Sequence, residues 1–224
     1  MSIIEDCVQK SIKKNLSSLN EDYDVRAKPV ELTTDLLTDR AKKIIKSAYE
    51  KSVEDLNEVS TLIEGAQRET GASGRSAYRD LKQDEQRLIS QSFLIASFLE
   101  NIDDQNSTLS MDSLSYMRLT RDWGTFDDWQ KDFLACALNS RSGFAVTGYS
   151  RLLKRYMNIC IDEDMSGIPP DFTAIVTICV FDKFYTRDYL DKKESYIRAM
   201  MKEIRWDLVE TRIKAIEKSQ KKKD

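Results

Sequence analysis

Few side chains in this 224-residue chain could do chemistry, because the sequence contains no histidine. The lack of imidazole excludes serine–histidine and cysteine–histidine dyads as well as histidine metal ligands. One pair of reactive groups stands four residues apart, the thiol of Cys179 and the ammonium of Lys183. A nearby cation lowers the pKa of a thiol, so one interpretation is a nucleophilic cysteine. The alternative is a small hydrophobe at a strand end, followed by a surface or interface charge.

The cysteine spacing argues against zinc and disulfide-rich proteins, and the charge balance argues against a protein that binds nucleic acid over its whole surface. The four cysteines form no CxxC pair, which is typical of a reduced intracellular chain rather than of a zinc site or a disulfide framework. With 35 Lys and Arg against 38 Asp and Glu, the net charge is −3, and 41% of the residues are hydrophobic. This composition indicates a soluble globular protein and argues against nucleic-acid binding over the whole surface. A local RNA contact stays open through the basic residues of the C-terminus, Lys218, Lys221, Lys222 and Lys223.

The N-terminal segment is amphipathic. No membrane partner is expected, since no apolar stretch approaches the roughly eighteen residues of a membrane span, and no secretory signal is visible. One helical face of residues 1–19 would carry Ile4, Val8, Ile12, Leu16 and Leu19. An organelle presequence can have this pattern, but Glu5 and Asp6 argue against one here. A docking helix is the favoured interpretation.

The first half of the chain predicts two long helices. Apolar residues recur at helical spacing from Leu37 to Gly65, and the run Thr33–Asp35 offers an N-cap. A second helical pattern runs from about Ser76 to Ile102, after a loop that holds Gly71 and Gly74. Two long helices joined by such a loop indicate an antiparallel helical hairpin.

The second half changes character. Thr125–Asp128 has the pattern of a capping box that opens a helix through Leu138. Three β-rich runs follow, and helical spacing then returns twice. These runs cover residues 143–149, 152–161 and 172–181, and the helical patterns cover 189–201 and 206–216. The order predicts an α+β chain rather than a doubly wound parallel sheet.

Composition shifts along the chain suggest four parts, with the polar stretch 103–113 as the best domain boundary. The expected parts are an N-terminal extension with a docking helix (1–28), a helical hairpin domain (29–108), an α+β domain (109–217) and a basic tail (218–224).

A set of motifs, in order and at compatible spacing, resembles the iron/manganese superoxide dismutases. In the second half, Thr125–Phe133 is similar to the family's SFxxFKxxF, Ser142–Val146 to GSGWxW and Cys179–Tyr185 to DVWEHAYY. In the first half, Ser52–Asn57 is similar to YVxNLN and Ser90–Phe93 to NHTF. The resemblance spans about residues 30–213. It implies the fold of that family, a helical hairpin followed by an α/β domain with a three-stranded antiparallel sheet.

The resemblance also implies that the metal site is lost. The family holds iron or manganese with three histidines and one aspartate. Carried over residue by residue, these positions are Ile44 (Ile45 with a one-residue slip), Gln91, Cys179 and Lys183. An isoleucine has no donor atom, and a lysine ammonium repels a cation. We therefore expect no cofactor and no dismutase activity.

The residues that surround the metal in the family are replaced as well. The gateway tyrosine corresponds to Ser52, and an adjacent histidine pair corresponds to Ala48 and Tyr49. A glutamine that can bond metal-bound solvent corresponds to Arg87. Losing the ligands and their surroundings together is typical of a fold kept without its site.

A partner surface is expected at Asp182, Lys183 and Tyr185. In the family, the acidic position that matches Asp182 reaches across a two-fold dimer. Asp182 and Lys183 would then form an acid–base pair with a partner chain. The alternative is an ordinary surface ion pair, worth little.

The resemblance suggests where such a protein works. The mitochondrial small ribosomal subunit of fungi and some other eukaryotes carries paired superoxide-dismutase-like proteins without metal sites. We therefore expect a structural ribosomal protein of the mitochondrial matrix, paired with a homologous chain and touching other mitochondrial ribosomal proteins. The main alternative is a free pseudoenzyme that dimerises with an active superoxide dismutase and regulates it. A third reading is an active dismutase or hydrolase with an unrecognised site.

Overall fold

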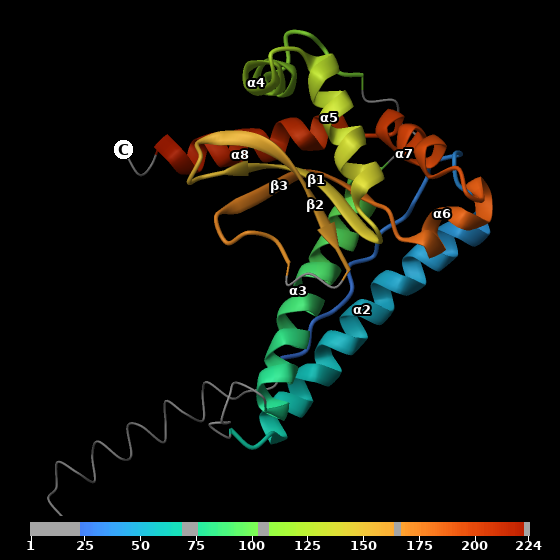
Figure 1. Cartoon of the computed structure of the whole chain (residues 1–224), viewed down its shortest axis with the longest axis vertical. Helices are drawn as coiled ribbons and strands as arrows, with labels where there is room; N and C mark the ends of the chain where they lie inside the picture. Colours follow the sequence, from blue (N-terminus) through green and yellow to red (C-terminus); the bar gives the residue numbers. More distant parts are fainter. Residues whose placement is uncertain (1–22, 69–75, 103–107, 164–166, 222–224) are drawn as a thin grey trace, which may run out of the picture.

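The computed structural model describes residues 23–68, 76–102, 108–163 and 167–221. Its first half is the predicted hairpin, in which α2 (Asp39–Gly65) and α3 (Ala77–Asn101) lie side by side (Figure 1). Both helices bury an apolar stripe against each other and against the rest of the chain. The proposed docking helix at residues 1–19 lies outside the described residues.

The start of α2 differs from the prediction. The run Thr33–Asp35 does not cap the helix, because Thr34 Oγ1 accepts a hydrogen bond from the N–H of Leu36 at 3.1 Å and closes a short turn. The N-cap is Thr38, whose hydroxyl accepts from the N–H of Ala41. The start of α3 agrees with the prediction, and Ser76 caps it.

The second half holds an antiparallel three-stranded sheet in the order β2-β1-β3, flanked by helices. This arrangement confirms the predicted α+β fold. The strands are β1 (Gly143–Ser150), β2 (Arg155–Asp162) and β3 (Phe172–Cys179). The helices are α4 (Leu114–Trp123), α5 (Phe126–Asn139), α6 (Asp182–Tyr189), α7 (Lys193–Lys202) and α8 (Trp206–Lys221).

Two local predictions in the second half were wrong. The helical pattern over 189–201 does not form one helix, because α6 ends at Leu190, which has a φ of +55°, and α7 begins at Lys193. The strand predicted from Leu152 begins only at Arg155, since the preceding residues form the β1–β2 turn.

Three further boundaries differ from the sequence pattern. Helix α4 was not predicted, although Ser113 caps its start and Gly124, with a φ of +91°, ends it. Strand β3 ends at Cys179 rather than at residue 181. Helix α8 continues to Lys221, so the start of the predicted basic tail is helical.

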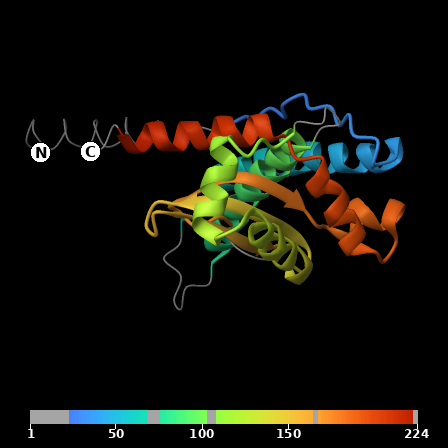
Figure 2. The ribbon, with the colours of Figure 1, turned by 90° about the horizontal axis from the view of Figure 1, so that it is seen from above.

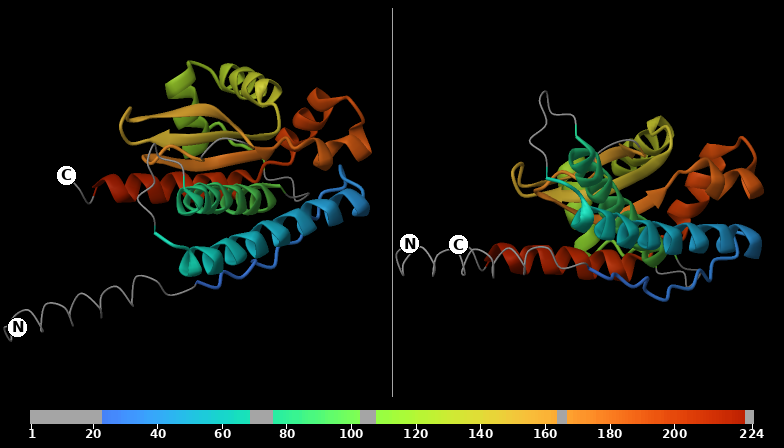
Figure 3. Two further views of the ribbon diagram at one scale, coloured as in Figure 1. Left: turned by 60° about the horizontal axis from the view of Figure 1, so that its bottom comes forward. Right: turned by 90° about the horizontal axis from the view of Figure 1, so that it is seen from below.

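A continuous core joins both halves of the chain. Phe98 of α3, Trp129 of α5 and Tyr196 of α7 are fully buried in one cluster. Helices α4 and α5 cover one face of the sheet, and α3 and α8 cover the other (Figure 3). Helices α6 and α7 lie beyond the end of the sheet, next to the start of α2 (Figures 1 and 2). Within the described ranges, no helix is long and apolar enough to cross a bilayer.

Candidate functional site

Helices α2, α3 and α6 line a cleft of about 450 Å³, which holds five of the eight positions that the resemblance assigns to a metal site and its surroundings. Its walls include Ala48 and Ser52 from α2, Arg87 and Gln91 from α3, and Lys183 from α6. Two of the four ligand positions, Gln91 and Lys183, therefore share this cleft. The other two do not line it: Ile44 is half-buried against the core and Cys179 is fully buried at the end of β3.

The amide of Gln91 is already engaged. Arg87 Nη1 donates to Gln91 Oε1 at 3.4 Å, and Arg87 Nη2 reaches Asp84 Oδ1 at 3.3 Å. The carbonyl oxygen is the one atom of a glutamine side chain that can bind a hard cation. A guanidinium, which always carries a positive charge, now lies at that oxygen and would repel a metal ion.

The thiol of Cys179 is held in its neutral form. Burial raises its pKa well above the ordinary value, although the backbone N–H of Phe181 and the charge of Lys183 act in the opposite direction. A metal ligand or a nucleophile has to be a thiolate. The catalytic interpretation of Cys179 therefore finds no support in its surroundings, which are those of a small core residue.

The ammonium of Lys183 lies over two aromatic rings, 5.2 Å from the centroid of Phe181 and 5.7 Å from that of Phe184. These cation–π contacts hold the side chain at the mouth of the cleft. A hydrocarbon, an engaged amide, a neutral thiol and an ammonium do not fit the iron or manganese of the family. Across the described ranges, no three Cys, Asp or Glu side chains are grouped so that they could hold a metal ion.

Two groups that the sequence analysis did not assign to the site, Ser92 and Glu163, lie beside or in the cleft. Ser92 Oγ donates to Ser52 Oγ at 3.1 Å, and Ser52 Oγ donates to the carbonyl of Tyr49 at 2.7 Å. This buried hydroxyl pair ties α3 to α2 where the family has its gateway tyrosine. Glu163, from the loop after β2, also reaches the cleft. Nothing in the local sequence indicated Glu163, because only tertiary packing brings that loop to α3.

The comparisons with known proteins agree with this fold. A sequence profile of the iron/manganese superoxide dismutases, C-terminal domain, matches residues 113–212. The iron superoxide dismutase of Cupriavidus metallidurans is 25% identical over 194 residues, covering 84% of this chain and 95% of that protein. The chain is thus similar to the iron/manganese superoxide dismutases, over residues 113–212 in the profile and over 84% of its length in the Cupriavidus enzyme.

Two manganese enzymes match over a shorter length. The manganese superoxide dismutase of Mycolicibacterium smegmatis is 27% identical over 94 residues, 42% of this chain and 45% of that protein. That of Corynebacterium diphtheriae is 25% identical over 101 residues, 45% of this chain and 51% of that protein. The chain thus matches about half the length of these two superoxide dismutases.

The face expected to bind a partner lies on α6, in the segment that resembles the dismutase motif. Asp182 and Lys183 are exposed in its first turn, whereas Tyr185 is buried and points inward. The hydroxyl of Tyr185 donates to Asp182 Oδ1 at 2.7 Å, and its ring stacks on Tyr196 at 5.4 Å. Burial and the Asp182 carboxylate raise the pKa of Tyr185 to about 12. Tyr185 therefore fixes the position of the Asp182 carboxylate.

Contacts at its other end hold α6 on the hairpin. Asp188 accepts hydrogen bonds at 2.8 Å from both the N–H and the hydroxyl of Thr38, the N-cap of α2. The hydroxyl of Tyr189 donates to the carbonyl of Leu36 at 2.9 Å. The superoxide-dismutase-like scaffold thus presents Asp182 and Lys183 on a helix that is held by the Tyr185 ring and by its C-terminal end.

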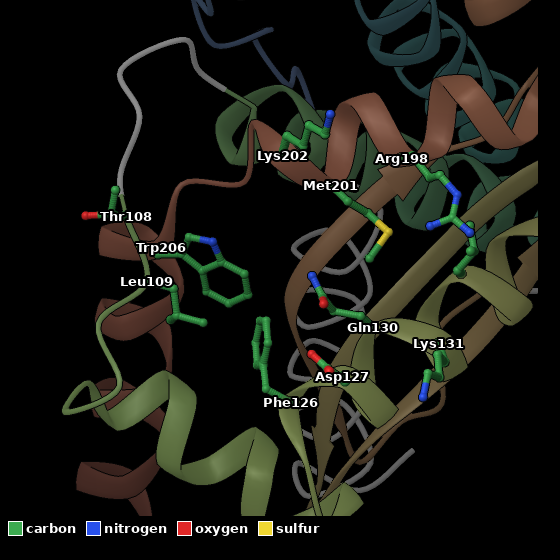
Figure 4. Close-up of a pocket in the computed structure, with 11 residues that line it drawn as sticks. Thr108, Leu109, Phe126, Asp127, Gln130, Lys131, Arg198, Met201, Lys202 and Trp206 are labelled. Atoms are coloured by element: carbon green, nitrogen blue, oxygen red, sulfur yellow. The ribbon is translucent and has the colours of Figure 1, made fainter.

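A second, wider cleft of about 930 Å³ lies between α5, α7 and the start of α8 (Figure 4). Phe126 and Trp206 form an aromatic wall there, with their ring centroids 5.6 Å apart. Lys131, Arg198 and Lys202 also line it. Its mixture of aromatic and basic side chains suits binding, and no nucleophile–base pair is among its lining residues.

Proposed function

We propose that this chain is a non-catalytic structural protein that uses a superoxide-dismutase-like fold to bind other proteins. One observation carries the proposal: the four positions that would hold the metal now offer no compatible donor set. Gln91 is occupied by Arg87, Cys179 is a buried neutral thiol, and Lys183 places a positive charge at the mouth of the cleft.

The retained feature is the α6 face. Three hydrogen bonds to the residues before α2 and one ring stack on α7 hold this helix in place, and the two charged side chains of its first turn stay exposed. An acidic and a basic residue side by side can pair with the same two charges on a chain related by a two-fold axis. A homologous partner chain would carry such charges at the matching positions, so we propose a heterodimer through α6.

We further propose that the assembly is the mitochondrial small ribosomal subunit, where the chain would contact other ribosomal proteins. The support is the resemblance to metal-free superoxide-dismutase-like ribosomal proteins. Lys218, exposed near the end of α8, is the described member of the proposed RNA contact. The side chains of Lys221, Lys222 and Lys223 lie outside the described residues.

The test is affinity purification of the tagged chain from cells, followed by sucrose-gradient sedimentation and mass spectrometry. We expect small-subunit proteins and one homologous chain to sediment with it. The variant Lys183→Glu should lower recovery of the homologous chain at least tenfold, because it places like charges at the interface. Lys154→Glu, a matched charge change at the exposed β1–β2 turn, should have no effect. A chain that sediments alone, with no co-purifying protein, would overturn the proposal.

The same experiment distinguishes the regulatory pseudoenzyme. A pseudoenzyme would stay at the top of the gradient and co-purify with an active superoxide dismutase, which an activity stain detects. An active enzyme is tested on the pure chain by metal analysis and a dismutase assay. Stoichiometric iron or manganese with turnover would show that the assignment of the ligand positions is wrong.

A further inference from the structure

Two cysteines outside the former ligand positions lie on the two elements, α5 and β2, that pack against each other. Cys136 lies on α5 and is half-buried, and Cys160 lies on the outer strand β2 and is exposed. Neither belongs to the cleft that holds the former ligand positions. Both are free thiols.

Hydrogen bonds on either side of this pair set the register of helix and strand. On one side, Asn158 Nδ2 donates to Asp132 Oδ2 at 2.8 Å. On the other, Ser140 Oγ donates to Asp162 Oδ1 at 3.2 Å. The helix and the strand therefore advance in the same direction between these contacts. Cys136 is four residues after Asp132 and four before Ser140, which keeps it on the same helical face.

The spacing along the strand matches that along the helix. Cys160 is two residues after Asn158 and two before Asp162, so its side chain shares their face of β2. Four helical residues advance about 6 Å and two strand residues about 6.6 Å. Each thiol therefore lies midway between the two flanking hydrogen bonds, Cys136 along the helix and Cys160 along the strand. Burial first, then the charge of Asp132 and last the charge of Cys160 raise the pKa of Cys136 to about 11.

We propose that Cys136 and Cys160 are a redox-sensitive dithiol that closes into an intrachain disulfide between α5 and β2. The oxidant is a low-molecular-weight disulfide such as glutathione disulfide. Because β2 is the outer strand, bonded in the sheet to β1 alone, it can move toward α5 without displacing a second strand.

Closure takes two exchange steps. The exposed Cys160 thiolate attacks one sulfur of the small disulfide, forms a mixed disulfide and releases one small thiolate. The Cys136 thiolate then attacks the Cys160 sulfur and expels the second. The protein loses two electrons to the small disulfide, and the two thiol protons pass to the two released thiolates.

The test treats the full chain with glutathione disulfide, blocks free thiols with an alkylating reagent and maps the tryptic peptides by mass spectrometry. We expect a cross-link between peptides 132–141 and 156–183, with fragmentation assigning it to Cys160 rather than to Cys179. The variants Cys136→Ser and Cys160→Ser should lose the cross-link, and Cys7→Ser should keep it. Because burial raises the pKa of Cys136 to about 11, the closing step should accelerate about tenfold per pH unit between pH 7 and 9.

Two controls keep the result interpretable. In concentrated urea the preference for the Cys136–Cys160 pair should disappear, since only the folded register brings the two thiols together. Circular dichroism of each serine variant checks that it is folded. A folded protein that accumulates only a glutathione adduct on Cys160, or that joins Cys160 to a second molecule, would overturn the proposal.

Discussion

A carboxyl group at position 179 should destabilise this protein, although the resemblance to the superoxide dismutases implies a ligand aspartate at this position. Cys179 has no solvent exposure, and its pKa is already raised by burial. A carboxyl in the same place loses its hydration without gaining a metal ion. The variant Cys179→Asp therefore tests directly whether the metal environment has been lost.

The size of the effect follows from the expected pKa. If burial raises the pKa of the introduced carboxyl from about 4 to about 7, each unit costs about 1.4 kcal/mol, or about 4 kcal/mol at pH 7 and above. A raised carboxyl pKa favours the neutral acid in the folded state. Near pH 4 the loss should match that of a buried neutral polar group, and it should grow as the pH rises from about 4 toward the folded-state pKa and level off above that pKa.

The assay is urea denaturation between pH 4 and pH 8, with and without added manganese or iron. Cys179→Asn is the matched control, because its neutral amide should cost about 1–3 kcal/mol with no dependence on pH. Added metal should leave the midpoint of Cys179→Asp unchanged. The reasoning fails if Cys179→Asp is as stable as the parent at pH 7, or if manganese or iron restores its stability.

Three further predictions concern the former site and the packing around it. Restoring three histidines and one aspartate at the four degenerate positions should not give dismutase turnover near that of the family in a standard superoxide assay, because Ser52 and Arg87 remain. At Asp122, burial would raise the carboxyl pKa, but hydrogen bonds from Arg121 and from the N–H of Tyr156 outweigh it and lower the pKa. The stabilisation by the Asp122 carboxylate is therefore complete above about pH 5 and is lost as the pH falls through its folded-state pKa. In urea titrations, Asp122→Asn should lower the free energy of unfolding by about 2 kcal/mol at pH 7 and by progressively less below pH 4. Arg212 donates four hydrogen bonds to α3 and β3 from a mostly buried position. The variant Arg212→Met should therefore lower the free energy of unfolding by about 3 kcal/mol. A loss under about 1 kcal/mol would argue against a stabilising role of these bonds.

Local signals in the sequence were sufficient to predict most elements. Thr125 caps α5 as expected, and Ser76, where the second helical pattern was predicted to begin, caps α3. Such signals are local, because an N-cap depends on a side chain and on backbone groups two or three residues away. The N-cap Ser113 and the C-cap Gly124 are equally local signals for α4, the helix that the sequence analysis did not predict. The break at Leu190 had no such signal, since a non-glycine residue adopts a positive φ there.

The sequence by itself determined which chemistry this protein lacks and the order of its helices and strands. A chain without histidine cannot form the three-histidine ligand set that the resemblance implies, however it folds. Tertiary structure alone decided that Gln91 and Lys183 share a cleft while Cys179 lies buried outside it. It also set Cys136 opposite Cys160, through a register fixed by contacts on either side. Composition and periodicity depend on neighbours along the chain, whereas burial and side-chain pairing depend on segments that meet only after folding.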